Sequence, residues 1–177
     1  MDTISLTRIG IISDTHGHLD DRIAEVIADC DIAVHAGDIM GQCVLEQMQP
    51  RSGQVVAVRG NNDSEFIWPA HEHAALKDID HVASVQLPGG KLIVVHGHQH
   101  GGDHPKHDEM REHFPDARAI VYGHSHAMIC DTDYQPWVIN PGAAGRIRTR
   151  GGPSCLVLEA SVENWQVESI RFPDIED

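Results

Sequence analysis

The sequence contains very little lysine. Of its 177 residues, 13 are lysine or arginine, only three of these are lysine, and 27 are aspartate or glutamate, so the formal net charge is −14. Proteins that bind nucleic-acid backbones regardless of sequence need a basic surface that neutralises phosphates. The charge balance therefore argues against nucleic-acid backbone binding.

Long hydrophobic runs are also missing. No apolar run approaches the ~20 residues that a membrane-spanning helix needs, and the opening residues MDTISLTRIG lack the apolar core of a signal peptide. We therefore expect a cytoplasmic protein that does not interact with membranes.

Paired cysteines are absent too, since no C-x-x-C motif occurs. This argues against zinc-finger and thiol-redox motifs, and in a chain without a secretory signal we expect reduced, mostly buried thiols. The four cysteines are Cys30, Cys43, Cys130 and Cys155.

The length and composition fit one domain. A chain of 177 residues can bury a sizeable core without disulfides, and its hydrophobic content of 41% is ordinary for a globular protein. We expect a single domain over residues 1–177. The acidic surface is compatible with a monomer or with a homo-oligomer.

Apolar, β-branched runs alternate with helical patterns in the first third of the chain. This β-α-β-α-β order predicts parallel strands joined by helical crossovers. The strands are expected at 8–13, 32–37 and 54–60, and the helices at 20–29 and 42–48.

The remainder of the chain is mostly strand. A β-hairpin over 82–97 is expected to turn at Pro88-Gly89-Gly90, and a helix is expected near 107–114. Residues 60–76 lack a clear period and are expected to form a loop over the site. Further strands are expected at 117–123, 127–132, 136–139, 154–160 and 164–172.

Polar side chains follow five successive predicted strands, usually beside a glycine that allows a tight turn. In open α/β sheets, functional groups gather at the carboxyl ends of strands. Each fragment alone is commonplace turn chemistry, but the joint pattern is specific. In chain order, the residues are Asp14 and His16, Asp38, Asn61 with Asn62 and Asp63, His96 with His98, and His124 with His126.

Two carboxylates, one amide and four imidazoles among these residues can fill two neighbouring metal sites that share one ligand. Without a thiolate, this donor set suits manganese, iron, cobalt, nickel or zinc better than calcium or magnesium. Other polar residues have simpler interpretations. His35 within the second strand is expected to be a hydrogen-bonded core residue, and the tract 98–107 a solvated loop rather than a third metal site.

The ordered set resembles the calcineurin-like metallophosphoesterase superfamily, whose motifs are D-x-H, G-D, G-N-H-[D/E], H and G-H-x-H. The resemblance covers residues 8 to about 142, and the short chain with its V-V-H-G-H run is most similar to the small, single-domain YfcE-type phosphodiesterases. The matching residues are Asp14-Thr15-His16, Gly37-Asp38, Gly60-Asn61-Asn62-Asp63, His96 and Gly123-His124-Ser125-His126.

The resemblance implies an α/β fold, a four-layer α/β/β/α sandwich with two mixed β-sheets. It also implies two divalent metal ions, manganese as the first choice and nickel, cobalt, iron or zinc as alternatives. Asp38 would bridge the two ions. The implied ligands are Asp14, His16, Asp38 and His126 for the first metal, and Asp38, Asn61, His96 and His124 for the second.

The implied reaction is hydrolysis of a small phosphoester substrate, a phosphodiester in this branch, by a metal-bridging hydroxide. Asn62 stands where many members have a histidine that protonates the leaving group, and an amide cannot donate that proton near neutral pH. The implied catalytic residues are Asp38, Asn62, Asp63 and His98.

A further match is the segment NPGAAGRIR, residues 140–148, which lies near the substrate phosphate in the small branch. Ala143 replaces a serine there, and Arg146 and Arg148 are candidates for phosphate contacts. The alternative is a turn flanked by solvated arginines. The predicted substrate-binding residues are Asn62, His98, Asn140, Gly142 and Arg146.

Two alternative functions are not enzymatic. Some relatives of the small branch are non-catalytic interaction scaffolds with degraded metal sites (Vps29-like), and a protein that only stores or senses metal is conceivable. The complete ligand set counts against the scaffold, and only Asn62 favours it. Within the superfamily, the segment GDIMGQ disfavours a protein Ser/Thr phosphatase, while length and acidity disfavour a DNA-repair nuclease.

Overall fold

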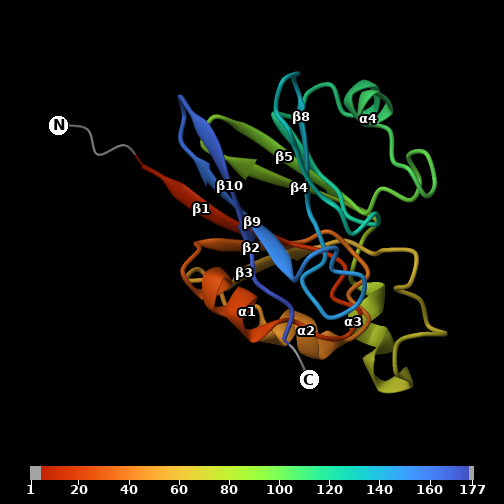
Figure 1. Ribbon diagram of the computed structural model, residues 1–177. Helices are drawn as coiled ribbons and strands as arrows, with labels where there is room; N and C mark the ends of the chain where they lie inside the picture. The colour runs from red at the N-terminus through yellow and green to blue at the C-terminus, as the bar shows by residue number, and fades with distance from the viewer. Residues whose placement is uncertain (1–4, 176–177) are drawn as a thin grey trace.

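Two five-stranded β-sheets pack face to face at the centre of the molecule, and helices cover their outer faces (Figure 1). The computed structural model describes residues 5–175. The layers run α/β/β/α, which confirms the predicted sandwich. None of the helices within 5–175 is long and apolar enough to cross a membrane. The helices are α1 (Asp21–Ala28), α2 (Gln42–Gln47), the 3-10 helix η1 (Ala70–Glu72), α3 (His73–Lys77) and α4 (His107–His113).

The first sheet has the strand order β10-β9-β1-β2-β3 and is mixed. β1, β2 and β3 are parallel, as the β-α-β-α-β pattern predicts, whereas β9 is antiparallel to both of its neighbours. The carboxyl ends of the three parallel strands therefore meet at one edge. The strands are β1 (Thr7–Ile12), β2 (Ile32–His35), β3 (Gln54–Ala57), β9 (Ser154–Ala160) and β10 (Trp165–Arg171).

The second sheet has the order β4-β5-β6-β8-β7 and is mixed as well. β4 and β5 form the predicted hairpin, in which Gly89 takes the positive φ of 87° that the turn requires. β5, β6 and β8 are parallel, and β7 is antiparallel to β8. The strands are β4 (Val82–Leu87), β5 (Gly90–Val95), β6 (Ala119–Val121), β7 (Met128–Asp131) and β8 (Trp137–Pro141).

Apolar side chains fill both faces of each central strand. On β1, Ile9 and Ile11 point into the core between the sheets, whereas Ile12 packs with the helices that cover the first sheet. On the other side of the molecule, Met110 of α4 packs against β5 and β6 of the second sheet. Strands buried on both faces read as continuous apolar runs, which is why the sequence shows them so clearly.

Two local predictions are wrong. The segment 60–76 is not loop throughout, because it contains η1 and most of α3, which is anchored by the fully buried Leu76. The thiols are not mostly buried either. Cys30 and Cys155 are buried, but Cys43 and Cys130 are exposed.

The inter-sheet core supplies a stability prediction. Leu158 on β9 is fully buried between the sheets, so Leu158→Ala removes apolar contacts and leaves a cavity. We expect a loss of ~2–5 kcal/mol in the free energy of unfolding, measured by urea denaturation. The control is Val162→Ala at a residue that is 74% exposed, which should change stability by less than ~0.5 kcal/mol. Similar losses in the two variants would contradict this packing.

Candidate metal centre

The predicted ligands lie at the carboxyl ends of five strands drawn from both sheets. Asp14, Asp38 and Asn61 follow β1, β2 and β3 of the first sheet. His96 and His124 follow β5 and β6 of the second sheet. Ligand atoms of Asp14, His16 and His126 lie within 4.8 Å of one another, and so do those of Asp14, Asp38 and His96. The fold thus gathers residues that are more than 100 positions apart in the chain.

The backbone at these positions is strained. Five of the seven predicted ligands have a positive φ, a region in which non-glycine residues cost about 1–3 kcal/mol each. Such strain clusters at functional sites, where the surrounding structure enforces it. The values are 53° for Asp14, 47° for His16, 54° for Asp38, 67° for His124 and 57° for His126.

Glycines are required where loops approach the carboxylates closely. A Cβ at Gly60 would overlap Oδ1 of Asp38, and a Cβ at Gly123 would overlap Oγ of Ser13 and lie 2.6 Å from Oδ2 of Asp14. These contacts give a steric reason for the glycines in G-N-N-D and G-H-S-H.

Asp14 is fully buried, and its two oxygens differ. Oδ2 accepts hydrogen bonds from the Ser13 hydroxyl (2.7 Å) and the His124 backbone N–H (3.0 Å). Oδ1 is buried without a hydrogen-bond partner among the described residues, and it lies 3.4 Å from Nε2 of His126 and 3.9 Å from Nε2 of His96. Burial raises the pKa of Asp14 to about 7. A buried polar oxygen without a partner is costly, and a cation beside it would remove that cost.

Two imidazoles face each other next to Asp14. Nε2 of His16 lies 3.2 Å from Nε2 of His126. Nδ1–H of His126 donates to the Ile147 carbonyl (3.0 Å), which leaves the lone pair of Nε2 directed at the centre. Burial lowers the pKa of His126 to about 4 and also lowers that of His16, so both rings are neutral and able to bind a cation.

Asp38 lies between the His16–His126 pair and His96. Its Oδ2 is 3.6 Å from Nε2 of His16, and its Oδ1 is 3.5 Å from Nε2 of His96. Asn62 holds the carboxylate from the other side, with its backbone N–H on Oδ1 (2.9 Å) and its side-chain amide on Oδ2 (2.8 Å). Burial acts to raise the pKa of Asp38, but the hydrogen bonds from His96 and Asn62 hold it below the usual range.

Asn61 joins the remaining two imidazoles. Its Oδ1 lies 3.0 Å from Nε2 of His96 and 3.1 Å from Nδ1 of His124. Nδ1–H of His96 donates to the Ala36 carbonyl (2.8 Å), so its Nε2 points inward, as in His126. Burial acts to lower the pKa of His96, but the Asp38 and Asp14 carboxylates raise it above its usual value, so Nε2 carries a proton toward Asp38 that a bound metal ion would displace.

A buried network fixes the two loops that carry the carboxylates. Nδ1 of His35 accepts from the Gly37 N–H (3.1 Å), and its Nε2 lies 2.9 Å from Oγ1 of Thr15, which donates to the Ile39 carbonyl (3.1 Å). Burial lowers the pKa of His35 to about 3, so the ring stays neutral. His35 is therefore a hydrogen-bonded core residue, as predicted, and it ties the Asp38 loop to the Asp14 loop.

The residues fit divalent metal ions. The cluster offers an orphaned carboxylate oxygen on Asp14, the inward Nε2 atoms of His96 and His126, and the oxygens of Asp38 and Asn61. Nitrogen and oxygen donors without thiolate suit first-row metals such as manganese or zinc. The structure brings all seven predicted ligands together.

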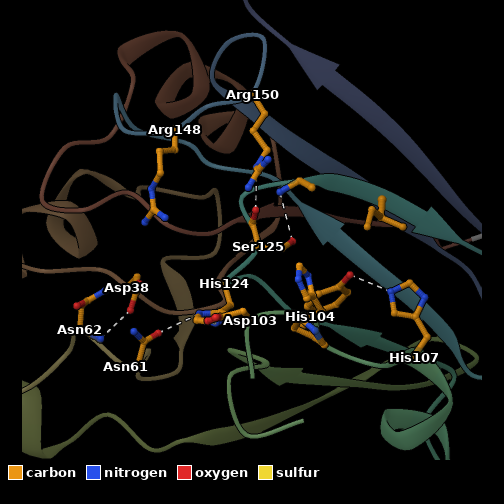
Figure 2. Close-up of a pocket in the computed structure, with 14 residues that line it drawn as sticks. Asp38, Asn61, Asn62, Asp103, His104, His107, His124, Ser125, Arg148 and Arg150 are labelled. Atoms are coloured by element: carbon orange, nitrogen blue, oxygen red, sulfur yellow. Dashed lines mark hydrogen bonds and ion pairs between the residues drawn. The ribbon is translucent and has the colours of Figure 1, made fainter. Parts of the chain in front are cut away.

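Two hollows flank this cluster. The larger, with a volume of about 720 Å³, is lined by Asp38, Asn61 and His124 on one side and by Arg148 and Arg150 on the other, and both arginines project into it (Figure 2). The second, of about 660 Å³, also touches Asn61 and is bordered by His98 and Phe66.

His98 lies beside His96 and His124, and its catalytic and substrate-binding role stays a prediction. Its ring centroid is 5.5 Å from that of His96 and 6.1 Å from that of His124. Its Nδ1 is buried without a hydrogen-bond partner among residues 5–175, and the residue borders the second hollow.

The contacts of Asp63 do not fit the predicted catalytic role. Its carboxylate accepts hydrogen bonds from four donors at 2.8–3.1 Å, so no lone pair is directed at the cluster. Asp63 instead holds the loops after β2 and β3 together. The donors are the backbone N–H groups of Ile39, Met40 and Gly60 and the indole N–H of Trp68.

The predicted substrate contacts of Asn140 and Gly142 are also not supported, because neither residue lines the larger hollow, and Arg146 borders a neighbouring hollow instead. Asn140 is fully buried and donates to the Gly123 carbonyl (2.9 Å) and the Ser125 hydroxyl (3.0 Å), so it supports the G-H-S-H loop. Gly142, with φ 75°, closes the turn after it.

The arginines that face the cluster are Arg148 and Arg150, and the sequence analysis missed Arg150. Nη2 of Arg148 is 3.4 Å from Nε2 of His126, and Nε of Arg150 donates to the Ser125 carbonyl (3.0 Å). Arg146 borders a different hollow. The alternating R-x-R-x-R spacing was the available signal, but it does not tell which side chains point inward.

Comparisons with known proteins agree with this geometry. The calcineurin-like phosphoesterase superfamily domain matches residues 7–163. Phosphodiesterase MJ0936 of Methanocaldococcus jannaschii is 30% identical over 173 residues, covering 90% of this chain and 96% of that protein. The fold is shared with the phosphoesterase YfcE of E. coli (TM-score 0.62, 20% identity, 93% of this chain and 98% of that one) and with vacuolar protein sorting 29 of Cryptosporidium parvum (TM-score 0.71, 19% identity, 96% and 99%). The chain belongs to the calcineurin-like phosphoesterase superfamily.

Proposed function

We propose that the chain is a phosphodiesterase that depends on two divalent metal ions. The observation that carries the proposal is the buried, unpartnered Oδ1 of Asp14, which faces inward imidazole nitrogens on two sides. Manganese is the proposed ion, and nickel, cobalt, iron or zinc would fit the same donors. The proposed ligands are Asp14, His16, Asp38 and His126 for one ion, and Asp38, Asn61, His96 and His124 for the other.

When bound, such ions would activate water and neutralise charge on the phosphate. The chain's own residues orient the ligands and bind the substrate. Asn62 keeps both oxygens of Asp38 in place, since it donates to each of them. Arg148 and Arg150 lie across the hollow from Asp38, where guanidinium groups can bind phosphate oxygens (Figure 2).

Two features support a diester rather than a monoester as the substrate. A diester has two substituents, and two hollows meet at Asn61, one on each side. In addition, the relative MJ0936 is a phosphodiesterase by name. His98 at the border of the second hollow is the proposed contact for one of the substituents.

The scaffold alternative shares the fold, as the likeness to vacuolar protein sorting 29 shows. In its favour stands Asn62, an amide that cannot protonate a leaving group. Against it, the ligand set is complete, and Asn62 has a clear use as the hydrogen-bond donor to Asp38. We therefore favour the enzyme.

Metal dependence is the first test. Chelator-stripped protein should not hydrolyse bis-p-nitrophenyl phosphate, and added manganese, nickel, cobalt or zinc should restore turnover. The added metal should also raise the thermal midpoint of unfolding, because it binds the folded chain and not the unfolded one. We expect a higher kcat/KM for this diester than for p-nitrophenyl phosphate. Bound metal without turnover of either ester would contradict the enzyme and favour the scaffold.

The second group of ligands can be tested through His124. His124→Ala removes one nitrogen from this group, and we expect metal affinity there to fall by more than ~10–100-fold, with a bound stoichiometry near one. Metal content by mass spectrometry and diester turnover are the measurements. His71→Ala is the control, since the His71 side chain is 82% exposed and contacts only Glu72. Full metal content and activity in His124→Ala would refute the two-metal assignment.

The phosphate contact can be tested through Arg148. Loss of charge-assisted hydrogen bonds worth ~1.5–3 kcal/mol predicts a ~10–100-fold lower kcat/KM for bis-p-nitrophenyl phosphate in Arg148→Ala. Arg51→Ala is the control, because Arg51 is 57% exposed and is paired with Asp29. Metal content must be equal in both variants. Wild-type kcat/KM in Arg148→Ala would show that this guanidinium does not bind the substrate.

A further inference from the structure

Three arginines within five residues have no carboxylate partner in the described chain. Arg146 forms neither a hydrogen bond nor an ion pair with residues 5–175, Arg148 contacts only His126, and Arg150 donates to the Ser125 carbonyl. Carboxylates are abundant in this protein, with 27 acidic against 13 basic residues. A cluster of unpaired guanidinium groups is therefore unexpected on charge grounds alone.

The loop that carries these arginines is firmly anchored. Nη1 of Arg171 donates to the carbonyls of Thr149 (3.2 Å), Arg150 (2.7 Å) and Gly152 (3.3 Å). The Thr149 hydroxyl donates to Oδ1 of Asp174 (3.0 Å). The loop is thus held by the end of β10 and by the segment that follows it.

Its backbone is also strained. Arg148 and Arg150 have φ values of 49° and 52°. Strain of this kind is retained where the surroundings enforce a functional geometry. Here it sets the backbone conformation at two exposed, charged residues.

Arg148 lies between two hollows. It lines the one over the metal cluster, and it also lines a neighbouring one of about 430 Å³ together with Arg146 and His18. Of the two carboxylates in this hollow, Asp20 is paired with Arg22 (2.8 Å), and Asp174 keeps its charge while it accepts from the Thr149 hydroxyl. Among the described lining residues, the guanidinium groups of Arg22, Arg146 and Arg148 thus outnumber the two carboxylates, which leaves a net positive charge.

We propose that the hollow between Arg146 and Arg148 binds a second phosphate group of the substrate. The substrate would be a phosphodiester with a further phosphate on one of its two substituents. This inference rests on the proposed phosphodiesterase function. Alternate residues of a chain are at most ~7 Å apart, so a group of sugar size can bridge the scissile phosphate near Arg148 and a phosphate at Arg146. Guanidinium groups bind phosphate in a bidentate manner, which suits this role.

The test uses two chromogenic diesters that differ by one phosphate, thymidine 5′-(p-nitrophenyl phosphate) and its 3′-phosphorylated form. We expect the manganese-loaded enzyme to show a kcat/KM about tenfold or more higher for the phosphorylated diester. The net charge of −14 acts in the opposite direction, so a general field effect cannot produce this preference. Arg146→Ala should reduce the advantage to less than about threefold, and Arg51→Ala should retain it.

Equal kcat/KM values for the two diesters, or an advantage that persists in Arg146→Ala, would overturn the inference. Absence of turnover for both diesters, with metal bound, would instead overturn the proposed function. In that case, titration calorimetry tests the second phosphate site separately, because it measures binding without turnover. Thymidine 3′,5′-bisphosphate should bind about tenfold more tightly than thymidine 5′-monophosphate, and Arg146→Ala should abolish the difference. Equal affinities would refute the second phosphate site.

Discussion

The burial of two carboxylates among four imidazoles is the constraint on which the rest of this site depends. Asp14 is fully buried and Asp38 nearly so, and their pKa values move in opposite directions, with that of Asp14 raised to about 7 and that of Asp38 lowered. Donors such as His96 and Asn62 compensate the charge of Asp38 but leave one oxygen of Asp14 without a hydrogen bond. Divalent cations would compensate both carboxylates at once, which is why the donor set is best explained by metal binding.

The same constraint explains how much the sequence could predict. Most of the ligands follow apolar strands that are buried on both faces, so strand ends and ligand positions could be predicted from the local pattern, as for Asp14 after β1 and His124 after β6. Parallel strands then bring their carboxyl ends together, whatever the loop conformations are. The part that local pattern could not predict was set by long-range contacts. Arg171 on β10 fixes the loop at Arg148, and Trp68 donates to Asp63 from outside its motif.

The G-N-N-D motif illustrates this limit. Three consecutive polar residues have three different uses, since Asn61 faces the imidazoles, Asn62 binds Asp38 and Asp63 binds backbone N–H groups of neighbouring loops. The chemistry of a side chain does not tell in which direction a tight turn points it, so the sequence alone assigned Asp63 to catalysis. Asn62 lacks the proton donor of a histidine, but it donates hydrogen bonds to Asp38, which favours an altered but functional site over a decayed one.

The energetics of the site support the proposed enzyme over a scaffold that merely shares its fold. Five ligand positions have left-handed backbone conformations, at about 1–3 kcal/mol each, and Asp14 has a buried oxygen without a partner. These costs are a large share of the ~5–15 kcal/mol by which domains are stable. A scaffold could relieve them with glycine, asparagine or apolar residues at no loss of its surface. The retention of every one of these ligands, with an arginine loop in strained conformations beside them, therefore supports the proposed binding of cations and a phosphate together.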